Sequence, residues 1–200
     1  MTARAILVAV EDQLSAAVMR SLIAVSGKNL VIDRVVVAGG NGPLKAGVER
    51  FIAASHALPH VVLTDLDSSP CPPALLRDWR ADCLPSRVLI RVAVREVEAW
   101  LMADRSGIAE FLSVPVVKVP ASPEAEIDPK QTLVGLARKS RRRRLAQELA
   151  PQAGSSNRVG PLYNARLVEF ASSIWDVQRA RERAPSLDRA MHRLSQFLIP

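Results

Sequence analysis

The 200-residue chain has few cysteines and aromatic residues, and it lacks long apolar runs. The spacing of Cys71 and Cys83 fits neither a zinc site nor a disulfide framework, so we expect two buried free thiols. Aromatic residues make up only 4% of the chain, which disfavours a stacking platform for single-stranded nucleic acid. No apolar segment approaches a membrane span in length, and the first residues lack a signal-peptide pattern. We therefore expect a cytoplasmic protein without a membrane partner.

The chain is basic, with a formal net charge of +7, and most of the excess lies in its second half. The densest basic run extends from residue 138 to residue 144 and is interrupted only by Ser140. Such a run is usually a solvated face, but it can also contact the phosphates of a nucleic acid. The candidate nucleic-acid-binding residues here are Arg138, Lys139, Arg141, Arg142, Arg143 and Arg144.

Strand-like and helix-like segments alternate through the first half of the chain, which predicts βαβ units and a parallel sheet. We therefore expect an α/β fold: a Rossmann-like, mainly parallel four-stranded sheet flanked by helices. The expected strands are 5–10, 30–38, 60–63 and 88–94. The expected helices between and after them are 14–25, 44–57, 72–82 and 97–112, and the turn from Gly39 to Pro43 is expected to be a tight turn without a phosphate-binding motif.

The second half begins with a proline-rich segment, residues 114–129, which is expected to be a long loop, a linker or a lid. Helices are expected from Lys130 to about Ala150, from Leu162 to about Arg183, and from Ser186 to Leu198. We see no independent second core. The expected organisation is a single domain, 1–200, in which 1–113 form the α/β core and 114–200 pack on it. Tryptophans Trp79, Trp100 and Trp175 are expected in the core.

Acidic residues follow two of the expected strands. Glu11 ends the first strand, and Asp65 and Asp67 follow the third. Because ligands of parallel α/β sheets lie beyond the carboxyl ends of the strands, we expect these carboxylates to converge and to hold Mg²⁺ or Mn²⁺. Asp65 and Asp67 would point to the same side of an extended strand. The alternative is local: an Asx turn at Asp65 or Asp67, with Asp12 as a helix cap.

Further polar residues lie near the end of the fourth strand and could complete this site. Glu96 and Glu98 are candidate metal ligands or first-turn acids of a helix, and Arg95 is a candidate substrate clamp or salt-bridge partner. Lys130 could neutralise charge on a transferred phosphate, or it could be an ordinary surface lysine. For Asp104 we expect a helix cap, with the next helix starting at Arg105.

Glu11 with Asp65-Leu66-Asp67 resembles the Toprim arrangement of topoisomerases, DnaG-type primases and overcoming-lysogenization-defect nucleases. Other segments are similar to a family of uncharacterised bacterial Toprim-like proteins linked to phage defence or restriction. These segments are Arg91 to Asp104, Asp128-Pro129-Lys130, Gly160 to Asn164, and Pro185-Ser186-Leu187. The resemblance implies a Rossmann-like sheet that binds Mg²⁺ or Mn²⁺ and cuts or rejoins phosphodiesters. Glu11 would be a general acid/base or metal ligand, and Asp65 and Asp67 would be metal ligands.

Two functional hypotheses follow. In the first, the protein is a metal-dependent nuclease or phosphoryl-transfer enzyme that acts on DNA or RNA. Its catalytic residues would be Glu11, Asp65, Asp67, Glu98 and Lys130, and Glu96 would assist with the metal. In the second, it is a catalytically silent subunit that works with a protein partner such as an ATPase. This alternative is motivated by Asp12 and Ser69, which stand where Toprim proteins usually have a glycine and a third acid.

Overall fold

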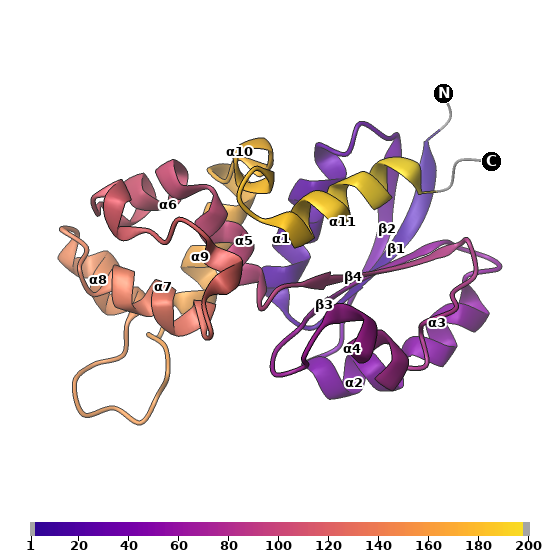
Figure 1. Ribbon diagram of the computed structural model, residues 1–200, viewed down its shortest axis with the longest axis horizontal. Helices are drawn as coiled ribbons and strands as arrows, with labels where there is room; N and C mark the ends of the chain where they lie inside the picture. Colours follow the sequence, from indigo (N-terminus) through magenta and orange to yellow (C-terminus); the bar gives the residue numbers. More distant parts are fainter. Residues whose placement is uncertain (1–2, 198–200) are drawn as a thin grey trace.

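Residues 3–197 are described by the computed structural model, and a parallel four-stranded β-sheet forms its centre (Figure 1). The strands lie in the order β2-β1-β3-β4. Each is a run rich in β-branched residues, which favour extended backbone. The predicted α/β class is therefore confirmed. The bounds are Arg4–Val10 for β1, Leu30–Val37 for β2, His60–Asp65 for β3 and Val88–Ala93 for β4.

Helices cover both faces of this sheet because its inner strands are apolar on both sides. Along β3, Val61 and Leu63 pack into one hydrophobic cluster and Val62 packs into another, the period-two alternation of a strand. The first cluster includes residues of α1 (Gln13–Ala24) and α11 (Pro185–Gln196). The second includes residues of α2 (Asn41–Ala46), α3 (Val48–Ala54) and α4 (Pro72–Asp78).

A second group of helices lies beyond the carboxyl ends of the strands, on the left in Figure 1. It shares one hydrophobic cluster with the sheet, so residues such as Leu167 and Phe170 belong to the same core as Val8. The hydroxyl of Ser21 donates a hydrogen bond of 2.7 Å to the carbonyl of Ala171 and so fixes α1 to this group. Its helices are α5 (Val97–Ala103), α6 (Arg105–Leu112), α7 (Pro129–Ala137), α8 (Arg143–Leu149), α9 (Tyr163–Ser173) and α10 (Val177–Arg181). The proline-rich segment contains two 3-10 turns, η1 (Val116–Lys118) and η2 (Pro123–Ala125).

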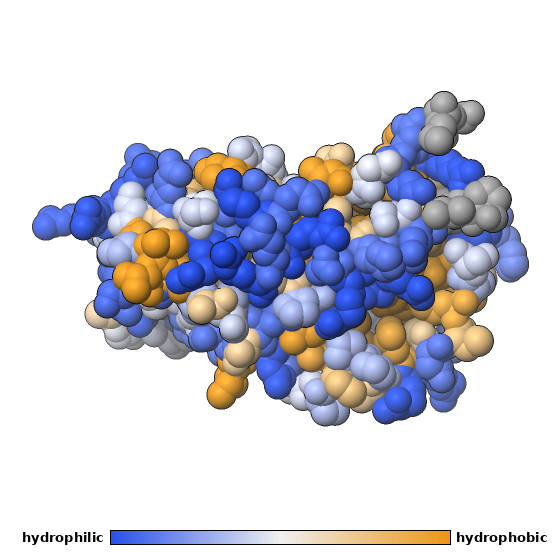
Figure 2. Space-filling view, turned by 45° about the horizontal axis from the view of Figure 1, so that its top comes forward, coloured by the Kyte–Doolittle hydropathy of each residue, from blue (hydrophilic) through white to orange (hydrophobic). Residues whose placement is uncertain are grey.

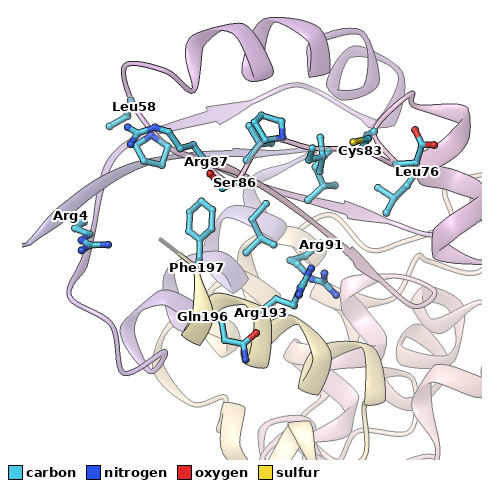
Figure 3. A pocket seen from close by; sticks show the side chains of 18 of the residues that line it. Arg4, Leu58, Leu76, Cys83, Ser86, Arg87, Arg91, Arg193, Gln196 and Phe197 are labelled. Carbon is cyan, nitrogen blue, oxygen red and sulfur yellow. The ribbon is translucent and has the colours of Figure 1, made fainter. Parts of the chain in front are cut away.

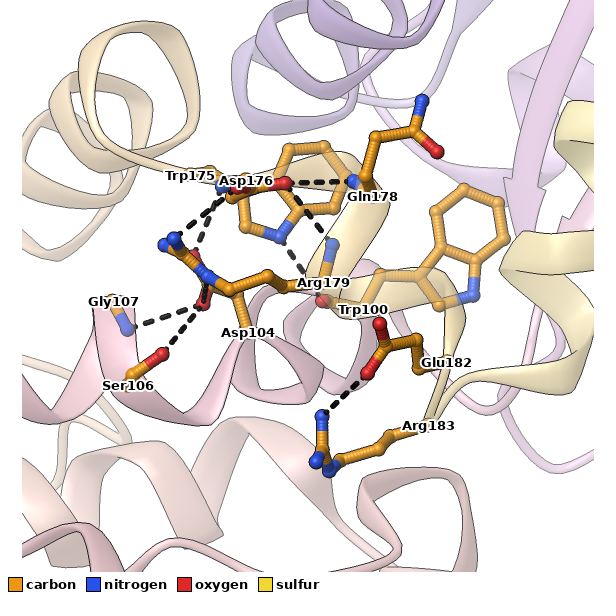
Figure 4. Close-up of polar contacts among 10 residues, drawn as sticks. All are labelled: Trp100, Asp104, Ser106, Gly107, Trp175, Asp176, Gln178, Arg179, Glu182 and Arg183. Atoms are coloured by element: carbon orange, nitrogen blue, oxygen red, sulfur yellow. Dashed lines mark hydrogen bonds and ion pairs between the residues drawn. The ribbon is translucent and has the colours of Figure 1, made fainter.

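Asp104 links α5, α6 and α10 (Figure 4). As predicted, it caps α6, because its side chain accepts a hydrogen bond of 3.1 Å from the N–H of Gly107. It also accepts hydrogen bonds from the N–H of Asp176 and from the guanidinium of Arg179. Burial alone would raise the pKa of Asp104, but these donors outweigh it and the pKa lies below its usual value. Asp104 is therefore a structural carboxylate rather than a ligand.

Three of the predicted long helices are interrupted. The helix expected over 44–57 is two short helices, α2 and α3, that meet at Gly47. The helix expected over 130–150 is broken between α7 and α8, and that over 162–183 is broken between α9 and α10, where Asp176 caps α10. The last helix ends at Gln196, and Leu198 lies outside the described residues. Apolar residues continue across the breaks at Gly47 and before Asp176, so the sequence pattern concealed these two, whereas the break between α7 and α8 falls in the basic run, which contains no apolar residue.

The prediction for the cysteines was half right. Cys71 and Cys83 are free, but both are exposed because they lie in the surface segments that flank α4. The predicted core tryptophans are confirmed: Trp79, Trp100 and Trp175 are all buried. None of the helices in residues 3–197 combines the length and apolarity that a membrane crossing requires.

Candidate functional site

Glu11 and Asp65 are adjacent at the carboxyl ends of β1 and β3. Oε1 of Glu11 accepts hydrogen bonds from the N–H of Asp65, at 2.9 Å, and from the hydroxyl of Thr64, at 2.6 Å. Asn41 donates in turn to the Thr64 hydroxyl at 3.2 Å. Burial raises the pKa of Glu11 even though these donors favour its charged form. The ends of β1 and β3 thus bring the predicted site residues Glu11 and Asp65 together, and the hydrogen bonds hold the Glu11 carboxylate in place.

The turn after β2 also positions Glu11. Gly39 and Gly40 have positive φ angles, and their N–H groups donate to the carbonyl of Glu11 at 2.9 and 3.0 Å. Glycine tolerates this backbone conformation without steric cost. Both N–H groups already donate to a carbonyl of the protein and are not available to a phosphate. This agrees with the interpretation of the segment as a tight turn rather than a phosphate-binding loop.

Asp65 lies at the centre of the acidic cluster. One of its oxygens accepts a hydrogen bond of 2.9 Å from the N–H of Val97, the first residue of α5, so Asp65 stabilises the start of a distant helix rather than a local Asx turn. Its pKa is raised well above the usual value by burial, and further by the charges of neighbouring acids. Those neighbours are Glu98, Glu11, Asp67 and Glu96. Four other carboxylates that the sequence predicted as site residues therefore lie close enough to Asp65 to interact with it electrostatically.

Asp67 is not on an extended strand, which corrects the prediction that it parallels Asp65. β3 ends at Asp65, and Asp67 has a left-handed backbone with φ of 49° and is exposed. The N–H groups of Leu66 and Asp67 both donate to the carbonyl of Arg95, and these bonds turn the chain. The Asp67 carboxylate still raises the pKa of both Glu11 and Asp65.

Glu96 and Glu98 share Lys130 as a partner. The ammonium nitrogen of Lys130 lies 3.4 Å from an oxygen of each carboxylate, and the backbone N–H of Lys130 donates to Glu96 at 3.0 Å. Glu96 therefore also stabilises the first turn of α7, next to the Asp128 cap. Burial would lower the pKa of Lys130, but Glu98, Glu96 and Asp65 raise it above its ordinary value. Lys130 is consequently a cation of the acidic cluster and not an ordinary surface lysine.

Glu98 is the most buried acid of the cluster and has an incompletely satisfied carboxylate. One oxygen accepts a hydrogen bond of 3.2 Å from the hydroxyl of Tyr163, whereas the other is buried without a hydrogen-bond partner among the described residues. Burial raises the pKa of Glu98 to about 7, and Lys130 opposes that rise. Burial and the charge of Glu98 also raise the pKa of Tyr163. A buried lone oxygen of this kind has high free energy unless a proton or a cation meets it.

The sequence prediction missed Tyr163, Thr64 and Asn41 as members of the site. Tyr163 lies on α9 and reaches Glu98 across 65 positions of sequence, so no local pattern connects the two residues. Thr64 precedes Asp65 directly, and its alternation with Leu63 on β3 could have placed it at the strand end. Asn41 starts α2 and had been interpreted only as part of a turn.

The donor types of this cluster fit a hard divalent cation. In the described residues, no three or more His, Cys, Asp or Glu side chains are grouped so that they could hold a metal ion. Mg²⁺, however, is commonly bound through one or two carboxylates, with water and substrate phosphate in the remaining positions. Glu11 and Asp65 are such a pair. Burial is the main cause of the raised pKa values of both acids, and the charges of neighbouring acids add to it, so a bound cation would stabilise their ionised forms.

The residues of the basic run lie apart from this cluster, whereas Arg95 lies beside it. Arg95 donates a hydrogen bond of 3.0 Å to the carbonyl of Asp67 rather than to an acidic side chain.

The basic run begins after the carboxyl end of α7 and is exposed, whereas Lys130 lies in the first turn of the same helix. At 1.5 Å per residue, the length of α7 separates the two by about 13 Å. The expectation that the whole run lies in one helix was wrong, because only Arg143 and Arg144 belong to α8. Figure 2 shows both hydrophilic and hydrophobic residues at that end of the molecule.

Comparison with known proteins gives one distant structural likeness. No protein-family model matches the chain, and no curated protein matches it. The fold is similar to the C-terminal region of the Burkholderia pseudomallei OLD protein. The two share 14% sequence identity with a TM-score of 0.39, over 96% of this chain and 100% of that one. A likeness at this level supports no assignment of individual residues.

Proposed function

We propose that this protein is a metal-dependent phosphodiesterase or phosphoryl-transfer enzyme that acts on nucleic acid and uses Mg²⁺ or Mn²⁺. The observation that supports the proposal best is the contact between Glu11 and Asp65 at the carboxyl ends of adjacent strands, where each carboxylate has a raised pKa. Substrates and cofactors of open parallel sheets bind at this edge.

Glu11 and Asp65 would hold the cation, with Asp67 and Glu96 at the margin of the site. When bound, such an ion would polarise a phosphoryl oxygen and lower the pKa of a water molecule. Glu98 has a pKa near neutrality, which suits a group that takes up and releases a proton. Lys130 would stabilise negative charge on the phosphoryl group, because its ammonium is fixed beside the acids and remains charged.

The exposed basic run would supply affinity for the nucleic-acid backbone. Its side chains are solvated, and among the described residues only Arg144 has an ion-pair partner, Glu148. A separation of about 13 Å along α7 is short compared with an oligonucleotide, so one strand could contact both the run and the acidic cluster. This binding would be sequence-independent and salt-sensitive.

The proposal is tested by incubating the purified protein with end-labelled single-stranded DNA, duplex DNA and RNA, each with Mg²⁺, Mn²⁺ or EDTA. We expect cleavage of at least one substrate with metal and none with EDTA. Glu11→Gln and Asp65→Asn should each lower the rate at least about a hundredfold. Asp33→Asn, a change of an exposed acid on β2, is the matched control and should leave the rate unchanged. Cleavage that survives both Glu11→Gln and Asp65→Asn contradicts the proposal.

A second candidate is a binding subunit without catalytic activity, and one observation favours it. Lys130 already supplies a positive charge to Glu96 and Glu98, and a protein cation can take the place of a metal ion. In this case calorimetry would detect no Mn²⁺ binding, no substrate would be cleaved, and a fixed protein partner, for instance an ATPase, would copurify. Metal binding together with turnover excludes this candidate.

A further inference from the structure

A groove of about 1050 Å³ extends from the amino end of the sheet, at Arg4, Ala5 and residues 57–59, along the outer edge of β4, and no residue of the acidic cluster lines it (Figure 3). Consecutive residues from Pro85 to Arg91 line it. Because neighbouring side chains of a strand point to opposite faces, a groove that touches all of them must lie along the strand edge. Arg193 and Phe197, in and directly after α11, form one wall, and Leu76 of α4 with residues 81–84 forms the other.

The edge of β4 that faces this groove has free hydrogen-bonding groups. In residues 3–197, β4 pairs only with β3. The carbonyls of Arg87 and Ala93 accept hydrogen bonds from β3 and the residue after it, so the odd-numbered positions of β4 face β3. The N–H and C=O of Ile90 therefore point outward. The edge is closed at its two ends, because the N–H of Val88 bonds to Pro85 and that of Val94 bonds to Ser186.

The groove is positively charged, and within residues 3–197 its central arginine, Arg91, has no ion-pair partner. Nε of Arg91 is buried and has no hydrogen-bond partner among the described residues. Burial, together with the nearby charges of Arg193 and Arg189, lowers the pKa of Arg91 to about 10. Asp82 is the sole acidic residue among those that line the groove. A buried guanidinium N–H without a partner is destabilising unless an acceptor, such as a carboxylate, meets it.

We propose that this groove binds an extended acidic segment of a protein partner, which adds to the sheet as a fifth strand beside β4. The open edge at Ile90 would bond to the partner's backbone, as in other cases of strand addition. Carboxylates of the partner would face Arg91 and Arg193, and its alternate side chains would face Leu76 and Leu84 on the other wall. The structure thus favours a segment in which acidic and apolar residues alternate.

A second copy of this chain is a poorer occupant of the groove. Two-fold pairing of β4 with β4 would bring the Arg91 side chains of the two copies towards each other. Like charges opposed across a strand pair are destabilising. A single-stranded nucleic acid would satisfy the arginines but would not match the outward N–H and C=O of Ile90. An acidic peptide satisfies both features.

The probe is a fluorescein-labelled, end-capped hexapeptide of alternating glutamate and valine, measured by fluorescence anisotropy. We expect saturable binding, and no binding of the same peptide with lysine in place of glutamate. Arg193→Gln should raise Kd about tenfold, the effect expected from loss of one charge-assisted contact. Arg20→Gln, a change of an exposed arginine on α1, is the matched control and should leave Kd unchanged. Arg91→Gln provides a second test and should also raise Kd, because Nε of Arg91 is a buried donor without a partner among the described residues.

Strand addition makes a further prediction that simple charge attraction does not. Peptides N-methylated on one alternate set of amides should lose binding, whereas those methylated on the other set should retain it. Hydrogen exchange of the Ile90 amide should slow when the peptide binds. Equal loss for both N-methylated sets, or unchanged exchange at Ile90, overturns the proposal. So does tighter binding of oligothymidylate in the same groove, or a dimer that protects Ile90 without peptide.

Discussion

Lys130 on α7 and Glu98 on α5 form a largely buried ion pair, with 3.4 Å between the ammonium nitrogen and Oε1. The side chain of Glu98 is only 2% exposed, so its charge depends on this partner. The pair joins the helix that follows β4 to the helix that follows the proline-rich segment. Lys130 therefore couples the stability of the helical group to the charge of the acidic cluster.

Lys130→Met should destabilise the protein by about 1–3 kcal/mol, because it leaves Glu96 and Glu98 without their cation. Lys45→Met is the matched control. Lys45 pairs with Asp78 on the surface, so its loss should cost no more than about 0.5 kcal/mol. Urea unfolding of both variants at neutral pH measures the difference.

The double variant Lys130→Met/Glu98→Gln separates charge from packing. Glu98→Gln removes the charge that Lys130 balances, so the double variant should be more stable than the sum of the two single changes predicts, by about 1 kcal/mol or more. Additive effects would show that Lys130 stabilises the fold through its aliphatic stem alone.

Asp104 should make stability depend on pH in the acid range. Burial opposes its ionisation, but the hydrogen bonds of Arg179, Asp176 and Gly107 outweigh burial, and its folded-state pKa is below the unfolded value. This contribution is complete above the unfolded pKa and is lost as pH falls through the folded pKa. We expect Asp104→Asn to cost about 1–3 kcal/mol at pH 7. The gap between wild type and variant should narrow below about pH 4. A gap that stays constant with pH contradicts the role given to Arg179.

Gly160 permits the close approach that places Tyr163 beside Glu98. A Cβ at Gly160 would meet the carbonyl of Glu148 and lie 2.6 Å from the carbonyl carbon of Leu149. Gly160→Ala should therefore destabilise the protein by about 1–3 kcal/mol. Gly135→Ala, in the helical α7 with open space around its Cβ, should stabilise it by about 0.5–1 kcal/mol. Opposite shifts in Tm are expected, and equal shifts would contradict this packing.

The basic run should control the salt dependence of nucleic-acid binding. Replacing Arg141, Arg142 and Arg143 with Gln should weaken duplex binding and reduce the slope of log K against log salt by about 0.9 for each phosphate contact removed. Arg20→Gln/Arg50→Gln, changes of exposed arginines on the sheet half of the molecule, should leave the slope unchanged. An unaltered slope in the triple variant would identify the run as a solvated surface.

The strands, the sheet class and the first helix could be predicted from the sequence because each depends on a local pattern. Apolar runs that end at an acidic residue predicted β1 and β3, and the helical spacing of apolar residues predicted the extent of α1. The cap at Asp104 was predicted for the same reason, since capping involves residues three positions apart.

The remaining features depend on tertiary contacts that a local pattern does not contain. Tyr163 and Glu98 meet across 65 positions, and Asp65 caps a helix that starts 32 positions later. Asp67 leaves the strand because Leu66 and Asp67 bond to the carbonyl of Arg95, a contact between two loops. The adjacency of Glu11 and Asp65 could be predicted, because both residues lie at the carboxyl ends of strands that pair in the expected parallel sheet.

Anomalous diffraction from crystals soaked in Mn²⁺ tests the central claim most directly. The account predicts an anomalous peak within bonding distance of both Glu11 and Asp65, and no such peak in crystals of Asp65→Asn prepared in the same way. An empty site in wild-type crystals at saturating Mn²⁺, or a peak that is unaffected by Asp65→Asn, would contradict it.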